Sequence, residues 1–211
     1  MGRPREHDET TATALLDAAE RTIQEQGVGA LSLRALAQEA GTTTHAVYSL
    51  FGSKDGLLGA LGARAFELLQ EGLEALPAAG DPREEVVEAA LMFRRFATEH
   101  PALFSIGIQR ADPAVWPRFR SAAEEAFADL VRRFEPLADA GLLGGRSARE
   151  AATQFHALCE GLAALERRRM PLGPDPEAFW RSAFQALTAG FGAPAGHAAE
   201  RRPKARTIGG Q

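Results

Sequence analysis

The chain has 211 residues, of which 45% are hydrophobic, and a formal net charge of −4 at pH 7. This length and composition suffice for one domain, or two small ones, with a buried core. No apolar run approaches 18 residues and no signal-peptide pattern opens the chain, so we expect no membrane span and a cytoplasmic location.

The N-terminal region predicts a polar lead and then a helix. Residues 1–11 are polar, and we expect this stretch to be mobile. Apolar residues then recur at helical spacing over about 12–26, and Gly27 follows as a stop signal. We therefore predict the first helix over about 12–26.

Residues 32–54, SLRALAQEAGTTTHAVYSLFGSK, predict two short helices joined by a tight turn. Ser32 is placed to cap the first, whose apolar stripe consists of Leu33, Leu36, Ala37 and Ala40. Gly41 supplies the left-handed backbone that ends a helix without a clash at Cβ. Thr43 is placed to cap the second, whose short apolar stripe consists of Val47, Leu50 and Phe51. Ser53 is placed to cap the helix that follows.

The second of these helices has a polar face that the segment itself does not cover. A helix of about eight residues is not stable alone, so its neighbours must brace it. A braced helix with small hydrogen-bonding side chains suits insertion into a DNA major groove. In an ordinary helical bundle the same face would simply be solvated, and the pattern by itself leaves both interpretations open.

The remainder of the chain predicts further helices separated by breaks that contain proline and glycine. Their ranges are about 54–75, 82–99, 102–110, 118–138, 147–169 and 176–190. No segment alternates at the period of two that strands require, so the predicted fold class is all-α. The tail from Ala193, rich in Gly, Pro and Arg, predicts disorder.

A region of about 12–60 resembles the DNA-binding domain of the TetR family of bacterial transcriptional regulators. The resemblance is carried by residues at fixed spacing, namely Gly27, Leu33, Leu36, Ala37, Ala40, Gly41, Val47, Tyr48, Phe51 and Lys54. It is weaker beyond residue 60, where HPALFSIG (100–107) and AALERR (163–168) carry it. The chain departs from the common pattern at Thr42, Leu50 and Gly56.

The resemblance implies a domain organisation and a function. Residues 1–53 would form a three-helix, helix-turn-helix DNA-binding domain, residues 54–192 a helical effector-binding and dimerisation domain, and residues 193–211 a disordered basic tail. The protein would be a homodimeric repressor that a small, largely apolar effector releases from a double-stranded DNA operator. A dimer is needed because two recognition helices must reach major grooves about 34–36 Å apart.

The last two predicted helices are the candidates for the dimer interface. Each has an apolar face, made by Ala151, Ala152, Phe155, Leu158, Leu162 and Leu165 in one and by Phe179, Ala183, Phe184 and Leu187 in the other. Pairing with a second copy would give a four-helix interface, as the resemblance implies. Burial of the same faces within one copy is the alternative.

Eight residues are the predicted DNA contacts: Arg34, Thr42, Thr43, Thr44, His45, Tyr48, Ser49 and Lys54. Thr44, His45 and Ser49 are candidates for base edges, since a hydroxyl can bond several bases and a threonine methyl can meet a thymine methyl. Tyr48 resembles the phosphate-contacting tyrosine of the family. Lys54 is placed to hold a phosphate beside free helical N–H groups, and Arg34 fits either this role or that of a surface arginine.

Bulky side chains of the C-terminal helices are the candidates for an effector cavity: Met92, Phe93, Phe96, Phe104, Trp116, Phe119, Phe127, Phe155, His156 and Cys159. Core filling is the alternative for each of them. His156 and Cys159 stand three residues apart, a spacing that can hold a metal, but no further ligand clusters with them and we predict no metal site. The single cysteine also excludes an intrachain disulfide.

Three glycines recur at every third position of the predicted helix 54–75. Gly56, Gly59 and Gly62 each weaken a helix interior by about 1 kcal/mol relative to alanine. They indicate either a soft connector that shifts when a ligand binds, or close packing against a neighbouring backbone. The sequence leaves both open.

Charge and motif content define the competing hypotheses. Residues 1–53 carry four arginines against seven acidic residues, whereas a nucleic-acid binder usually has a basic patch. A helical ligand-binding or interaction protein of the same fold, without useful DNA affinity, is therefore the second hypothesis. No nucleophile–base pair, phosphate loop or metal cluster stands at a recognisable spacing, so we predict no enzyme, no catalytic residue and no cofactor.

Overall fold

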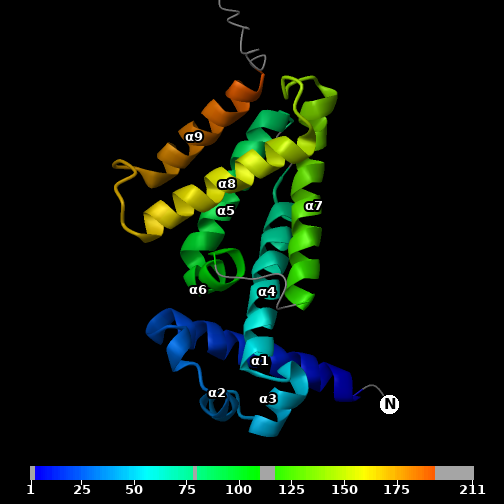
Figure 1. The fold of residues 1–211 in the computed structure, drawn as a ribbon, viewed down its shortest axis with the longest axis vertical. Coiled ribbons are helices and arrows are strands. Elements are labelled where there is room, and N and C mark those ends of the chain that lie inside the picture. The colour runs from blue at the N-terminus through cyan, green and yellow to red at the C-terminus, as the bar shows by residue number, and fades with distance from the viewer. Residues whose placement is uncertain (1–2, 78–79, 110–116, 193–211) are drawn as a thin grey trace, which may run out of the picture.

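The computed structural model describes residues 3–77, 80–109 and 117–192, and within these ranges every extended regular element is helical, which confirms the all-α prediction. Figure 1 shows α1 to α3 at one end of the molecule and α4 rising from them into a bundle with the later helices. The elements are α1 (Arg3–Gln26), the 3-10 turn η1 (Val28–Ala30), α2 (Leu33–Glu39), α3 (Thr44–Phe51), α4 (Lys54–Glu74), α5 (Pro82–Glu99), α6 (Pro101–Leu103), the π-helical η2 (Phe104–Gln109), α7 (Pro117–Asp139), α8 (Ala148–Arg167) and α9 (Pro176–Phe191).

The caps predicted for the first short helices are confirmed. The hydroxyls of Ser32, Thr43 and Ser53 accept hydrogen bonds from the backbone N–H groups three residues onward, at 3.4, 3.1 and 3.0 Å. Gly41 has φ +65°, the left-handed conformation expected for the turn between α2 and α3. Local sequence signals therefore set the boundaries of this segment correctly.

The predicted start of the first helix at about residue 12 is wrong, because α1 begins at Arg3 and is 24 residues long. Polar residues do not by themselves end a helix, and no proline or glycine interrupts 5–26. The predicted tail 193–211 lies outside the described residues. None of the helices in the described ranges is both long enough and apolar enough to cross a bilayer.

The helix predicted over 102–110 is replaced by two short elements. Pro101 begins α6, and the chain then widens into the π-helical η2 through Gln109. η2 lies against α4 at Gly107, where an added Cβ would stand 2.7 Å from the Cβ of Ala65 and 3.2 Å from the carbonyl oxygen of Gly62. The helical period alone did not predict this irregular backbone.

Close packing explains two of the three α4 glycines. A Cβ on Gly56 would stand 1.9 Å from the carbonyl oxygen of Phe51, and one on Gly62 would stand 2.6 Å from the ring of Phe119. Gly59 is buried as well. Close packing therefore explains the glycines at positions 56 and 62.

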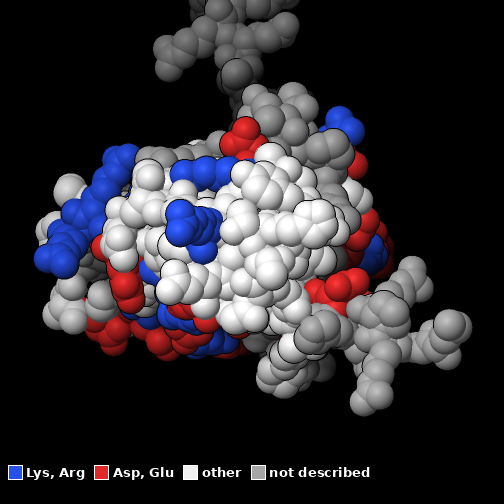
Figure 2. All heavy atoms as spheres, turned by 90° about the horizontal axis from the view of Figure 1, so that it is seen from below, with Lys and Arg blue, Asp and Glu red and all other residues white. Residues whose placement is uncertain are grey.

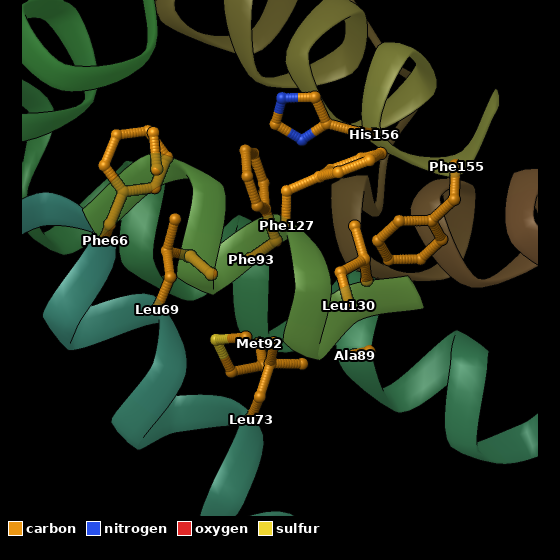
Figure 3. Close-up of a pocket in the computed structure, with 12 residues that line it drawn as sticks. Phe66, Leu69, Leu73, Ala89, Met92, Phe93, Phe127, Leu130, Phe155 and His156 are labelled. Carbon is orange, nitrogen blue, oxygen red and sulfur yellow. The ribbon is translucent and has the colours of Figure 1, made fainter. Parts of the chain in front are cut away.

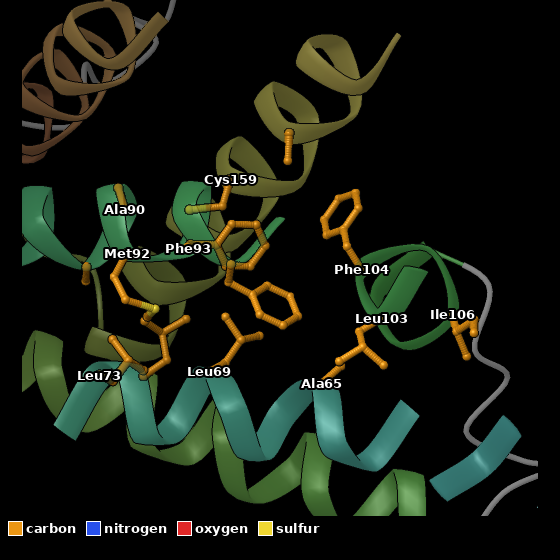
Figure 4. Close-up of a cluster of buried hydrophobic side chains, with 14 of the residues drawn as sticks. Ala65, Leu69, Leu73, Ala90, Met92, Phe93, Leu103, Phe104, Ile106 and Cys159 are labelled. Atoms are coloured by element: carbon orange, nitrogen blue, oxygen red, sulfur yellow. The ribbon is translucent and has the colours of Figure 1, made fainter. Parts of the chain in front are cut away.

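A continuous hydrophobic core runs from the α1–α3 end into the bundle. It joins Leu15 of α1, Val47 of α3 and Leu61 of α4, all of which are fully buried. Figure 4 shows the upper part of this core, where side chains of α4, α5, α6, η2 and α8 converge. The two ends of the molecule therefore share one packed interior.

Candidate functional site

The polar face of α3 is exposed at the free end of the molecule. Tyr48 has 52% of its surface accessible, and His45 and Ser49 are also exposed. Their side chains have no polar partner among the residues that the structure describes. Thr43 is exposed and caps α3, whereas Thr42 and Thr44 are half-buried. Six of the predicted DNA contacts therefore lie on one short surface.

The opposite face of α3 is anchored in the core. Val47 is fully buried, and Leu50 and Phe51 are half-buried against the same core. α3 contacts α1, α2 and α4, so the eight-residue helix is braced from three directions. The predicted need for bracing neighbours is thereby met.

Lys54 has a protein partner that sequence reasoning missed. Its Nζ donates a hydrogen bond of 2.8 Å to the carbonyl oxygen of Leu31, which ties the start of α4 to the segment before α2. Only the remaining N–H groups of this half-buried ammonium are available to a phosphate, and that contact stays a prediction. Arg34 is exposed on α2.

Three of the seven acidic residues at the α1–α3 end have a basic partner. Asp17 pairs with Arg64 of α4, Glu20 with His100 at the end of α5, and Glu39 with Arg21, each at 2.8 Å. Figure 2 views this end from below and shows a mostly uncharged middle, with Asp and Glu mainly toward the margins. The acidic excess is therefore not gathered over the middle of this end.

An apolar cavity of about 260 Å³ lies inside the bundle between α4, α5, α7 and α8. Its described lining consists of Phe66, Leu69, Leu73, Ala89, Met92, Phe93, Ala123, Ala126, Phe127, Leu130, Phe155 and His156. Figure 3 shows these side chains converging from the four helices. A 150 Å³ apolar cavity accommodates benzene, so this one has room for a ring with a substituent.

Half of the predicted cavity residues line this space. Met92, Phe93, Phe127, Phe155 and His156 do so, whereas Phe96, Phe104, Phe119 and Cys159 are buried beside it or elsewhere in the core, as the alternative had it. Trp116 lies outside the described residues. Sequence reasoning missed Phe66, Leu69 and Leu73, although the apolar stripe of the 54–75 helix was a usable signal.

His156 and Cys159, the pair with a metal-binding spacing, have different surroundings. The Nε2 of His156 is bound to Glu160 at 2.8 Å, and Cys159 is fully buried, where desolvation raises the pKa of its thiol well above the ordinary value. Across the described ranges, metal-ligating side chains nowhere gather in a group of three or more.

Aromatic contacts lead from the cavity toward α1. Phe93 meets Phe96 and Phe104 edge to face, with ring centres 6.3 and 6.1 Å apart. Phe96 stacks on His100 at 5.8 Å, and the Nδ1 of His100 lies 2.8 Å from a carboxylate oxygen of Glu20. Two ring contacts and one polar contact thus connect Phe93, in the cavity wall, with Glu20 of α1.

Half of the ten apolar residues predicted for the dimer interface are buried within the chain. Ala151, Ala152, Phe155, Leu162 and Phe184 are buried, as the alternative had it. Leu165, Met170 and Phe179 remain exposed where α8 ends and α9 begins. Ala157 and Gly161 of α8 and Ala186 and Gly190 of α9 extend this exposed uncharged surface.

Two family descriptions match the chain. That of bacterial regulatory proteins of the tetR family matches residues 15–61, and that of a tetracyclin repressor-like C-terminal domain matches residues 86–187. The first contains α2, α3 and most of the polar face described above. The second contains the helices that form much of the cavity.

Individual proteins match as well. The chain is 31% identical over 157 residues to the HTH-type transcriptional regulator BetI of Rhizobium meliloti (strain 1021), covering 72% of each protein. It is 42% identical over 72 residues to the HTH-type nicotine-responsive transcriptional repressor HdnoR of Paenarthrobacter nicotinovorans, covering 34% of this chain and 36% of that protein. A solved structure of a protein of unknown function from Rhodococcus sp. RHA1 aligns with a TM-score of 0.75 at 26% identity, covering 86% of this chain and 95% of that one.

Proposed function

This chain belongs to the TetR family of bacterial transcriptional regulators, and from that premise we propose that it is a homodimeric repressor released from its operator by a small apolar effector. Residues 1–53 would bind the operator, and residues 54–192 the effector and the second copy. Since a bacterial operator lies in the cytoplasm, the protein would act there. The proposal includes no enzymatic activity.

The observation that carries DNA binding is the exposed polar face of a helix anchored by Val47. The side chains of Thr44, His45 and Ser49 are free to bond base edges, and Tyr48 to bond a phosphate. Thr42 and Thr43 lie at the start of α3, where their groups can reach the backbone of the duplex. Arg34 supplies positive charge at the edge of this polar face. Lys54 adds to it through the N–H groups that are not bonded to the Leu31 carbonyl.

The exposed apolar residues of α8 and α9 support the dimer. Leu165, Met170 and Phe179 are large side chains that stay in contact with water in the single chain. Small residues beside them, Ala157 and Gly161, allow a second helix to approach closely. Burying such a surface against a second copy is favourable, at about 25 cal/mol for each Å² of apolar area.

The ring contacts beside the cavity support release by an effector. A ligand that moves Phe93 would also displace its neighbours Phe96 and Phe104, because both rings are in edge-to-face contact with the Phe93 ring. Phe96 reaches α1 through His100 and Glu20. An effector that favours the displaced arrangement shifts the population toward dimers whose recognition helices are wrongly spaced.

The test is binding of the purified full chain to its own upstream DNA at several salt concentrations. We expect sequence-dependent binding, and a log–log salt slope near −3.6 if Arg34 and Lys54 of both copies contact phosphate. Ser49→Ala and Tyr48→Phe should weaken binding while leaving the unfolding midpoint unchanged. Thr98→Ala, an exposed threonine on α5, is the matched control and should leave binding unchanged.

Dimerisation is tested separately by sedimentation equilibrium. Leu165→Glu places a charge on the exposed surface of α8 and should shift the protein toward monomer. Ala128→Glu adds the same charge to an exposed position of α7 and should not. A chain that is monomeric throughout, or that binds all DNA sequences equally at low salt, would favour the second hypothesis of a ligand-binding protein without useful DNA affinity.

A further inference from the structure

The cavity has one polar side chain among its described lining residues. Eleven of the twelve are Phe, Leu, Met or Ala, and the twelfth is His156. A ligand in this space is therefore held mainly by burial of apolar surface, and its polar group has one place to bond. A charged ligand has no described lining residue of fixed opposite charge, so transfer from water would cost it heavily.

His156 is held in a defined orientation. Its ring stands edge to face with Phe93 and with Phe127, at centre distances of 6.2 and 6.4 Å. Its Nε2 lies 2.8 Å from Oε1 of Glu160, one turn later on α8. Figure 3 shows the ring above Phe127 and Phe93 with one nitrogen turned toward them. Two rings and a carboxylate therefore fix which ring atom faces the cavity.

The bond to Glu160 selects the tautomer of the neutral ring. An ionised carboxylate only accepts hydrogen bonds, so Nε2 must carry the proton that it donates to Glu160. Nδ1 is then unprotonated and offers a lone pair. When the ring is neutral, the apolar cavity contains this acceptor and, within the described lining, no side-chain donor opposite it.

We infer that the effector is a small, uncharged, mainly apolar molecule that carries one hydrogen-bond donor, such as a hydroxyl group, and donates it to Nδ1 of His156. The inference rests on the proposed function, because it takes the cavity as the effector site. A volume of about 260 Å³ suits roughly one ring with a short substituent.

The experiment is calorimetric titration of the full chain with four probes that share one carbon frame. They are para-propylphenol, which donates, para-propylanisole, which only accepts, para-propylbenzoate, which is an anion, and propylbenzene, which has no polar group. We expect para-propylphenol to bind about tenfold more tightly than the anisole and propylbenzene, because it alone can donate a hydrogen bond to Nδ1 of His156. The benzoate should bind most weakly.

Two variants test whether His156 causes the preference for the phenol. His156→Phe keeps an aromatic ring but removes the acceptor, so it should bind the phenol and propylbenzene with similar affinity. Continued binding of propylbenzene shows that the cavity of this variant is intact. Glu160→Gln is the matched control, since a glutamine oxygen still accepts from Nε2 and the preference for the phenol should remain.

Equal affinity for all neutral probes would overturn the inference, as would an unchanged preference for the phenol in His156→Phe. Preference for the benzoate would also overturn it. That preference would indicate that a cation such as Arg149, 5.1 Å from the centre of the Phe127 ring, recruits an anion. Failure of every probe to bind would overturn it too. Operator binding and dimerisation are measured without any probe, so the proposed function stands or falls separately.

Discussion

The α3 face and the bundle cavity are built in opposite ways. The α3 face comes from one short segment, its side chains point into water, and its helix is held from behind by a few apolar contacts such as that of Val47. The cavity is assembled from four helices between residues 66 and 156, and its side chains are mostly buried. Residues of the α3 face can therefore change with little effect on stability, whereas residues around the cavity carry both stability and function.

Large-to-small substitutions should give the largest difference in unfolding free energy between the core beside the cavity and the α3 face. Phe104→Ala removes a fully buried ring that packs against Phe93, and it should lower the free energy of unfolding by about 3–5 kcal/mol. Tyr48→Ala, on the exposed α3 face, should change it by no more than about 0.5 kcal/mol. Urea unfolding measures both, and equal losses would contradict the contrast.

Filling a glycine on α4 should have the next largest effect. Gly62→Ala places a methyl group 2.6 Å from the Phe119 ring and should cost about 1–3 kcal/mol of unfolding free energy. Gly72→Ala meets only the flexible side chain of Met92, at 2.7 Å, and should cost less. If Gly62→Ala instead stabilises the protein, the soft-connector interpretation would replace close packing at that position.

Two cations at the α1–α3 end should differ in what they stabilise. Lys54→Met loses the bond to the Leu31 carbonyl and should cost about 1 kcal/mol of unfolding free energy. Arg34→Gln should leave stability unchanged and reduce the salt slope of operator binding by about 1.8, for one contact in each copy. An unaltered slope in Lys54→Met would show that this lysine is structural and does not contact phosphate.

The smallest effect concerns the buried thiol of Cys159. Because burial raises its pKa in the folded state, the unfolded chain loses this proton at lower pH than the folded chain does. The stability that the neutral thiol contributes is complete below the ordinary thiol pKa and declines as pH rises above it, by about 1 kcal/mol over the first unit. Urea unfolding at several alkaline pH values should show this decline in the native chain and a shallower one in Cys159→Ala.

The sequence predicted the features that depend on neighbours a few residues away. It placed the caps at Ser32, Thr43 and Ser53, the turn at Gly41 and the polar face of α3, because one helical turn and one hydrogen bond decide each of them. It failed at the start of α1, which lies at Arg3 and not near residue 12. It also failed at η2, whose backbone is π-helical and lies against α4.

By itself, then, the sequence determined the helical fold, the family resemblance and the α3 face, since helical period and capping are local properties of the chain. Only the tertiary structure decided which aromatic side chains surround a space and which fill the core. The sequence pattern does not distinguish Phe93 from Phe104, yet Phe93 lines the cavity and Phe104 is fully buried in the core. The physical reason is that burial depends on what the neighbouring helices bring to the same point, and helices distant in the chain meet there only after folding.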